Sequence, residues 1–280
     1  MNQIALRQQL TVFLQEDIGS GDRLNGILFS DEQQCHAHII AKEKGIFCGC
    51  DIVQVGFRLL SEQVHFAFYK NDGDLVQSGD VIVSIEGPIH AVLTGERVIL
   101  NLLQRLSGIA TITKEAVDQL NSNTTKVCDT RKTTPGLRMF EKYAVTCGGG
   151  VNHRFGLYDA VMLKDNHIAC AGSIRSAVQN IRNHLGPMVK VEVEVETFEQ
   201  LQEAVEAKVD VIMLDNQTPT NVKNMLSFIP ETMITEASGN ITPKNIASYR
   251  DTGVHYISLG YLTHSTKALD LSLLIDEGRK

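Results

Sequence analysis

The chain of 280 residues is long for one compact core, and its hydrophobic and charged fractions, 43% and 21%, are those of a globular protein. Its net charge of −7 argues against general nucleic-acid binding, which requires a basic face. The sequence has no apolar run that could span a bilayer and begins without the profile of a signal peptide, so we expect a cytoplasmic protein with no membrane partner.

The first third of the chain mixes helical and strand patterns. Apolar residues at helical spacing predict a helix over roughly residues 3–15. Alternation predicts a half-buried strand over 63–70, a turn comes after it, and a further strand is predicted over 81–85. A helix beginning near Thr94 has one apolar face, and the opposite face carries polar side chains at helical spacing, by default a solvated stripe: Arg97, Asn101, Gln104 and Arg105.

From Lys126 onward, short apolar strands alternate with helical stretches. The predicted strands are 126–129, 160–164, 189–196, 211–215, 233–237 and 256–260. The predicted helices between them are 135–147, 173–185, 198–207, 221–228 and 243–252. This alternation predicts a parallel sheet, and about six units without a Rossmann glycine fingerprint favour a barrel over the alternative, a flavodoxin-like open sheet.

Polar or charged residues stand at the carboxyl ends of these strands. They are Asp129–Lys132, Lys164–His167, Asp215–Asn216, Glu236–Gly239 and Gly260. In a βα barrel the carboxyl ends of all strands meet at one mouth, where catalysis takes place. Ordinary surface charge would instead be scattered along the helices, so the pattern predicts an active site at this mouth.

The third of these strands reads K-V-E-V-E-V-E, so its valines share one face and Glu192, Glu194 and Glu196 the other. Alone, the segment also fits an exposed antiparallel strand. Inside a βα barrel the valines would face the helices and the glutamates the interior, where buried carboxylates need cations, hydrogen bonds or metal. Residues 126–167 hold seven Lys and Arg against four acidic residues, and this basic island supplies such cations.

The six cysteines are scattered through the chain. Cys48 and Cys50 stand one residue apart, but no second pair completes a zinc site. We therefore expect buried, reduced thiols.

Six motifs in this order resemble the quinolinate phosphoribosyltransferase family, and the resemblance extends from Glu16 to Ser265. They are TGERVILNLLQRLSGIAT (94–111), DTRKTTPGLRMFEKYAV (129–145), GGGVNHRFGLYDAVMLKDNHI (148–168), EVEVE (192–196), MLDN (213–216) and EASGNI (236–241).

This resemblance implies an N-terminal α/β sandwich, over 1–108 and rejoined by 270–280, followed by an incomplete (β/α) barrel of about six strands over 109–269. It further implies a homo-oligomer, a dimer or an assembly of dimers, in which a neighbouring subunit completes each active site. The implied reaction, in NAD biosynthesis, joins quinolinate to phosphoribosyl pyrophosphate with Mg²⁺ and gives nicotinate mononucleotide, pyrophosphate and CO₂.

The resemblance also implies a role for each matching residue. The cations that receive the quinolinate carboxylates and the pyrophosphate are Arg131, Lys132, His153, Arg154 and Lys164. Arg97 would come from the neighbouring subunit, Glu194 and Asp215 would hold the ribose hydroxyls and magnesium, and the 5-phosphate would lie on Ser238, Gly239 and Gly260. The expected catalytic residues are Glu194, Asp215, Lys132 and Lys164.

The chain departs from the family pattern at two places. Arg23-Leu24 comes after Asp22, where the family usually has a threonine two residues after the GD of that motif, and Asn240 replaces a glycine of the presumed phosphate loop. Asn tolerates positive φ better than most residues, so a similar turn is expected. The alternative functions are a molybdenum-transport-associated paralogue with another substrate, a Schiff-base enzyme using Lys164, and a non-catalytic phosphometabolite sensor.

Overall fold

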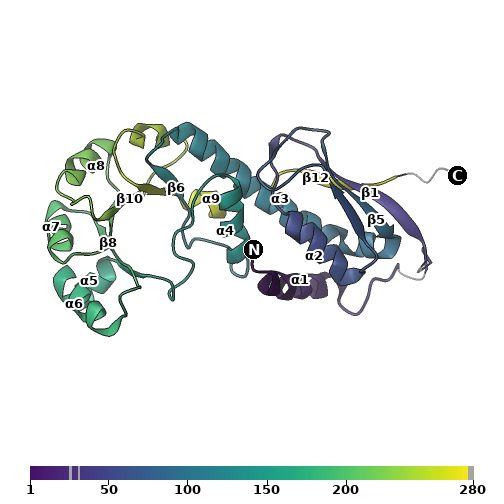
Figure 1. The fold of residues 1–280 in the computed structure, drawn as a ribbon, viewed down its shortest axis with the longest axis horizontal. Helices are drawn as coiled ribbons and strands as arrows, with labels where there is room; N and C mark the ends of the chain where they lie inside the picture. The colour runs from purple at the N-terminus through teal and green to yellow at the C-terminus, as the bar shows by residue number, and fades with distance from the viewer. Residues whose placement is uncertain (25–26, 31, 277–280) are drawn as a thin grey trace. The chain divides into compact units, whose positions relative to one another are not determined.

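The computed structural model describes residues 1–24, 27–30 and 32–276, and the chain forms two compact units (Figure 1). The first unit combines Met1–Ile112, Met139–Gly148 and the chain from Ser265 onward. The second unit combines Thr113–Arg138 and Gly149–His264. In the described part of the chain, no helix has both the length and the apolar character needed to cross a membrane.

The first unit contains an antiparallel sheet with the strand order β12-β1-β5-β3 and a small β2-β4 pair. Its elements are α1 (Gln3–Ile18), β1 (Gln34–Ala41), β2 (Gly45–Ile46), α2 (Cys50–Leu60), β3 (His65–Phe68), β4 (Leu75–Val76), β5 (Val81–Pro88), the first part of α3 (Ile89–Leu120), most of α4 (Arg138–Cys147) and β12 (Leu271–Ile275). Of these, β1, β2, α2, β4 and β12 lie outside the predicted elements, and α3 begins five residues before the predicted start.

The core of the first unit lies between this sheet and its helices. Ala37, Ile85 and Phe66 stand opposite one another on three neighbouring strands and share one face of the sheet. Phe57 of α2 packs on Phe66 with ring centroids 6.3 Å apart. The apolar face predicted for α3 is buried, with Ile99, Leu103 and Leu106 fully inside. The predicted α/β sandwich is therefore confirmed.

The predicted division of the chain at residue 108 differs from the observed units at α4, which was assigned to the barrel. Arg105 of α3 donates hydrogen bonds from Nε and Nη2 to Oε1 of Glu141 at 2.8 and 2.6 Å, and the Glu141 side chain is fully buried. Phe140 lies with its ring 5.9 Å from that of Phe13 in α1. These contacts hold α4 in the first unit. Within the range 270–280, β12 pairs with β1, and residues 277–280 lie outside the described residues.

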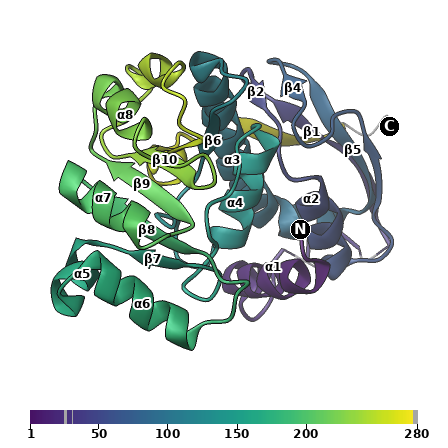
Figure 2. The same ribbon diagram turned by 60° about the vertical axis from the view of Figure 1, so that its left-hand side comes forward.

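The second unit is a six-stranded parallel sheet in the order β6-β11-β10-β9-β8-β7, with helices on its outside (Figure 2). The elements are β6 (Lys126–Cys128), β7 (Val161–Leu163), α5 (Asp165–Ala171), α6 (Ile174–His184), β8 (Val191–Val195), α7 (Phe198–Glu206), β9 (Val211–Asp215), α8 (Pro219–Leu226), β10 (Ile234–Ser238), the 3-10 helix η1 (Ile246–Tyr249), β11 (Tyr256–Ser258) and α9 (Tyr261–His264).

This strand order identifies an incomplete barrel. Neighbours follow the chain order from β7 round to β11, and β11 then pairs with β6, so the ring is open only between β6 and β7. A flavodoxin-like sheet would place its first strand between two others, whereas β6 is an edge. The valines of β8 are fully buried on the helix side, which confirms the predicted alternation in that strand.

The helix predicted over 243–252 is reduced to η1. Asn245 accepts the backbone N–H of Thr242 on its side-chain oxygen at 2.7 Å and donates from its amide to the carbonyl of Asn240 at 3.0 Å. This side chain therefore stabilises a turn at the place where a longer helix would need regular backbone bonding. The proline behind a hydroxyl residue, Thr242-Pro243, gave the misleading helix signal.

We expect Gly108→Ala to destabilise the protein, although alanine normally stabilises a helix interior by about 1 kcal/mol relative to glycine. A Cβ on Gly108 would lie 2.1 Å from the backbone oxygen of Lys267, so the segment that bonds α3 through Leu269 must move. Overpacking of this kind costs about 1–3 kcal/mol in the free energy of unfolding measured with urea. Gly186→Ala is the control, because nothing lies near its added Cβ. Equal stability of the two variants would contradict this packing.

Candidate active site

A cavity of about 450 Å³ opens at the carboxyl ends of the barrel strands. Its lining comes from every strand end of the second unit: Thr130, Arg131, Lys132, His153, Arg154, Met162, Lys164, Glu194, Met213, Asp215, Asn216, Glu236, Ser238, Gly239, Asn240 and Ser258. Nine of these are predicted site residues: Arg131, Lys132, His153, Arg154, Lys164, Glu194, Asp215, Ser238 and Gly239. The barrel topology thus brings most of the predicted site together.

Two predicted site residues have other positions. Gly260 comes after β11 and lies against Lys132, since a Cβ at Gly260 would be 3.0 Å from Cδ of that lysine. Arg97 belongs to α3 in the first unit, where its side chain is 63% exposed and its guanidinium lies 3.8 Å from the carboxylate of Glu96. Gly260 therefore leaves room for a cavity cation, and Arg97 is an accessible cation on a helix.

Hydrogen bonds fix the segment after β6 in place. Asp129 is fully buried and accepts the backbone N–H of His153 on Oδ1 at 2.8 Å. Thr263 donates from its hydroxyl to the carbonyl of Lys132 at 2.8 Å. Arg138 donates to the hydroxyl of Thr133 and to the carbonyl of Phe155, each at 3.0 Å. Arg138 thus joins the two segments that carry the cationic side chains.

Two of the cavity arginines form a cationic region. Burial, followed by the neighbouring charge of Arg131, lowers the pKa of Arg154. Arg154 donates from Nη1 to the carbonyl of Ala160 at 2.8 Å, which fixes its side chain. Among the described residues, Nε of Arg131 and Nε of Arg154 are buried without a hydrogen-bond partner. Two adjacent guanidinium groups with unused donors are suited to a multivalent anion.

Two buried glutamates surround the His153 ring. Nε2 of His153 lies 3.0 Å from Oε2 of Glu192 and 3.4 Å from Oε2 of Glu236. Both glutamates are almost completely buried, and burial is also the main cause that raises the pKa of Glu192. Neither was among the predicted ligands. The inward face of the K-V-E-V-E-V-E strand was the signal for Glu192, and the strand-end position was the signal for Glu236.

Burial alone would lower the pKa of His153, but the hydrogen bonds to Glu192 and Glu236 outweigh it and raise the pKa to about 10. The backbone N–H of Arg154 lies 2.9 Å from Nδ1 and favours a lone pair there. The carboxylates carry full charges and this amide only a partial one, so the protonated ring prevails. The site therefore holds a cation that persists at neutral pH.

Two carboxylates, those of Glu194 and Asp215, also line the cavity. Lys164 forms an ion pair with Glu194, whose side chain is 16% exposed. Burial, together with the charges of Glu194 and Glu196, raises the pKa of Asp215, and the side chain of Asn216 donates a hydrogen bond to Asp215 at 2.6 Å. Two neighbouring carboxylates attract positive charge, so this part of the cavity favours a cation or a cationic transition state.

A tight turn comes after β10. Gly239 has φ +81°, and a Cβ there would lie 2.3 Å from Oδ1 of Asn216, so the position requires glycine. Asn240 adopts φ +56°, and its side-chain amide donates to Oδ1 of Asn216 at 2.8 Å. Asn240 thus takes a left-handed conformation, which asparagine tolerates better than most residues. Its amide in turn links this turn to the end of β9, a contact that glycine could not make.

Both parts of the chain match domains of known proteins. Residues 22–107 match the N-terminal domain of quinolinate phosphoribosyl transferase, and residues 109–274 match its C-terminal domain. The chain belongs to the quinolinate phosphoribosyltransferase family. It is 54% identical to a probable nicotinate-nucleotide pyrophosphorylase [carboxylating] of Bacillus subtilis, over 98% of this chain and 94% of the relative.

A second relative is a probable nicotinate-nucleotide pyrophosphorylase [carboxylating] of Synechocystis, 42% identical over 95% of this chain and 91% of its own. Among solved structures, NadC from Streptococcus pyogenes superposes with a TM-score of 0.94 at 42% identity and covers 99% of both chains. Both units of the quinolinate phosphoribosyltransferase fold are therefore present in this chain.

We expect the imidazole of His153 to titrate near pH 10, well above the ordinary value of about 6.5. Because the folded pKa is the higher one, protonation stabilises the fold fully below pH 6.5, and this contribution is lost as the pH rises through 10. Glu192→Gln should lower the pKa of His153 by about 1 unit or more. The titration can be measured from the NMR resonances of the imidazole ring. Glu196→Gln, at an exposed residue just beyond β8, is the control. An unchanged titration in Glu192→Gln would refute the assignment.

Proposed function

We infer that the chain is a quinolinate phosphoribosyltransferase, which joins quinolinate to phosphoribosyl pyrophosphate and forms nicotinate mononucleotide, pyrophosphate and CO₂. The observation that carries this inference is one barrel-mouth cavity whose lining combines several cationic side chains with the carboxylates of Glu194 and Asp215. Quinolinate has two carboxylates and phosphoribosyl pyrophosphate has three phosphates. Such substrates need several cations at once, and a relative from Nicotiana glauca, 39% identical over 97% of this chain and 82% of its own, is named quinolinate phosphoribosyltransferase [decarboxylating] 2, mitochondrial.

The cations would bind the two substrates before any bond changes. Arginine gives bidentate hydrogen bonds to a carboxylate, so Arg131 and Arg154 fit quinolinate, and the lasting charge on His153 adds a third donor. Lys132 and Lys164 are point charges suited to phosphate oxygens. Ser238, Gly239 and Gly260 would receive the 5-phosphate. The positive φ of Gly239 and Asn240 in the turn after β10 supports this, because such turns can direct successive backbone N–H groups at an anion.

The carboxylates of Glu194 and Asp215 would act on the transition state. When the bond between C1 of the ribose and the pyrophosphate breaks, positive charge develops on the ribose ring, and the neighbouring carboxylates of Glu194 and Asp215 would stabilise it. The pyridine nitrogen of quinolinate then forms the new bond to C1. The ring, now positively charged, accepts the electron pair left when the adjacent carboxylate departs as CO₂, and a proton replaces that carboxylate. No protein nucleophile takes part.

Magnesium is the proposed cofactor. Glu194 and Asp215 are hard oxygen donors, and they lie near each other, since the charge of Glu194 is one of the causes that raise the pKa of Asp215. Bound there, Mg²⁺ would neutralise charge on the pyrophosphate leaving group. The two carboxylates supply few ligands, so substrate and water oxygens would complete its coordination.

We expect nicotinate mononucleotide and CO₂ to form only when quinolinate, phosphoribosyl pyrophosphate and Mg²⁺ are all present, measured by chromatography and by release of labelled CO₂. Nicotinate lacks one carboxylate and its charged hydrogen bonds, so its kcat/KM should be at least about tenfold lower. Equal turnover of nicotinate would contradict quinolinate specificity. Binding of both substrates without turnover would indicate a sensor, and no binding of quinolinate a paralogue with another substrate.

We further propose a homo-oligomer in which Arg97 of one subunit serves the barrel of its neighbour. The supporting observation is that Arg97 is mostly exposed and has only the adjacent Glu96 as an ion-pair partner in the described chain. Lys132, by contrast, lines the barrel cavity itself. A shared site would therefore need Arg97 and Lys132 from different subunits.

Arg97→Ala and Lys132→Ala proteins should each be nearly inactive, and an equal mixture after subunit exchange should recover about a quarter of the wild-type activity, because in a dimer half the molecules are mixed and one of their two sites is intact. The matched control mixes Lys132→Ala with Glu194→Ala, two changes in the same barrel, and should recover nothing. If the first mixture stays inactive after mass spectrometry confirms exchange, Arg97 serves its own barrel.

A further inference from the structure

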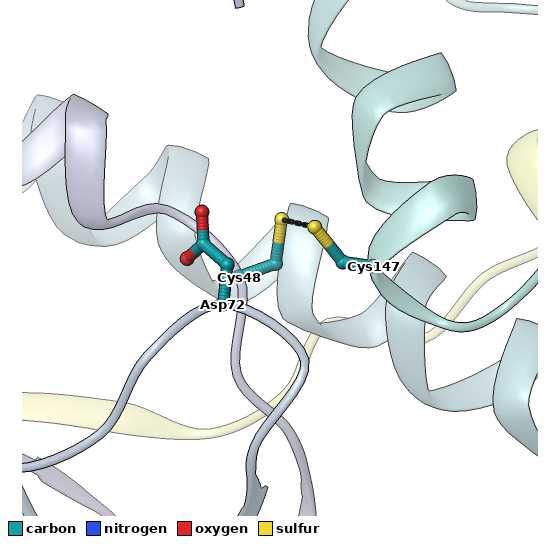
Figure 3. Close-up of side chains that lie close together, drawn as sticks. All are labelled: Cys48, Asp72 and Cys147. Carbon is teal, nitrogen blue, oxygen red and sulfur yellow. Dashed lines mark hydrogen bonds between the residues drawn. The ribbon is translucent and has the colours of Figure 1, made fainter.

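Two cysteines far apart in the sequence face each other in the first unit. Cys48 lies between β2 and α2, and Cys147 is the last residue of α4, 99 positions later. Their Sγ atoms are 3.5 Å apart and point toward one another (Figure 3). The sequence predicts buried, reduced thiols and gives no sign that Cys48 has a partner. The return of α4 to the first unit instead gives it a partner.

Asp72 lies beside this pair, and the three side chains together are of a kind that can hold a metal ion. The carboxylate of Asp72 is, however, already used. Its Oδ1 accepts the backbone N–H groups of Gly49 and Cys50 at 2.6 and 2.9 Å, and its Oδ2 accepts the hydroxyl of Tyr143 at 2.5 Å. A metal would have to displace these hydrogen bonds. The two thiols are thus better placed to react with each other than to hold an ion.

The third nearby cysteine does not compete for this reaction. The thiol of Cys50 donates toward the carbonyl of Lys70 at 3.8 Å. Burial, with the charge of Asp72 as the next cause, raises the pKa of Cys50 to about 12, so its thiolate is scarce at neutral pH. The reactive pair is therefore Cys48 with Cys147.

The two members of the pair differ in reactivity. Cys48 is fully buried, whereas Cys147 is half-buried and can meet a small oxidant. The hydrogen bond from the Cys48 thiol lowers the pKa of Cys147, and the same interaction raises the pKa of Cys48 well above its ordinary value. Since the thiolate is the nucleophile, Cys147 would react first and Cys48 second.

We propose that Cys48 and Cys147 are a redox modification site, at which a hydroperoxide converts the thiol pair into a reversible disulfide. The Cys147 thiolate attacks one peroxide oxygen, the O–O bond breaks, and cysteine sulfenic acid and hydroxide or alkoxide form. The Cys48 sulfur, losing its proton, then attacks the Cys147 sulfur, the S–O bond breaks, and water leaves. The two sulfurs lose two electrons in total and the peroxide gains them.

The wild-type protein treated with hydrogen peroxide should yield, in peptide mapping without reductant, one linked pair that contains Cys48 and Cys147, and dithiothreitol should separate it. Cys48→Ser should leave a sulfenic acid on Cys147 that dimedone traps. Cys147→Ser should remove both the link and the trapped product. Cys170→Ser is the matched control, because Cys170 is the exposed cysteine of the described chain, and its loss should leave the link intact.

The decisive measurement is made on the wild-type chain, so it does not depend on whether a variant folds. If peroxide oxidises Cys170 while Cys48 and Cys147 remain unlinked, the proposal is wrong. It is also overturned if the purified protein takes up one equivalent of zinc that protects both thiols, since the pair would then be a metal site. A link from Cys147 to any cysteine other than Cys48 would equally contradict the geometry.

Discussion

The cavity at the barrel mouth holds like charges close together. Arg131 lowers the pKa of neighbouring Arg154, and Glu194 contributes to raising that of Asp215. Neither arrangement is favourable by itself, because each pair repels within a partly buried region. The barrel holds Glu194 and Asp215 at its strand ends, and a hydrogen bond to the carbonyl of Ala160 fixes Arg154. The charges of this cavity are therefore satisfied best by ligands that themselves carry separated charge.

The side chain of His153, held by the buried carboxylates of Glu192 and Glu236, adds a further positive charge to this arrangement. An isolated buried imidazolium would lose its proton, and two carboxylates at 3.0 and 3.4 Å prevent that. The carboxylate of Asp129 also accepts a hydrogen bond from the backbone N–H of the same histidine. The cavity therefore contains the charged imidazole of His153 whether or not a substrate is bound.

The sequence allowed prediction of those features that depend on periodicity. Alternation in β8 placed its valines outside and its glutamates inside, and polar residues at strand ends located the cavity. Long-range contacts could not be predicted in this way. The assignment of α4 to the first unit rests on Arg105 and buried Glu141, which share no local signal. The pairing of Cys48 with Cys147 results from that same contact and was hidden for the same reason.

The first unit is assembled from three stretches of chain, and its sheet gains the β12 strand only near the carboxyl terminus. During synthesis on the ribosome, β1 can pair with β5 at once but must wait for almost all of the barrel before its other edge is covered. An uncovered strand edge is a template for pairing with other chains. The nascent protein is thus most prone to aggregation while the barrel is being made, and rapid translation of that region would shorten the vulnerable interval.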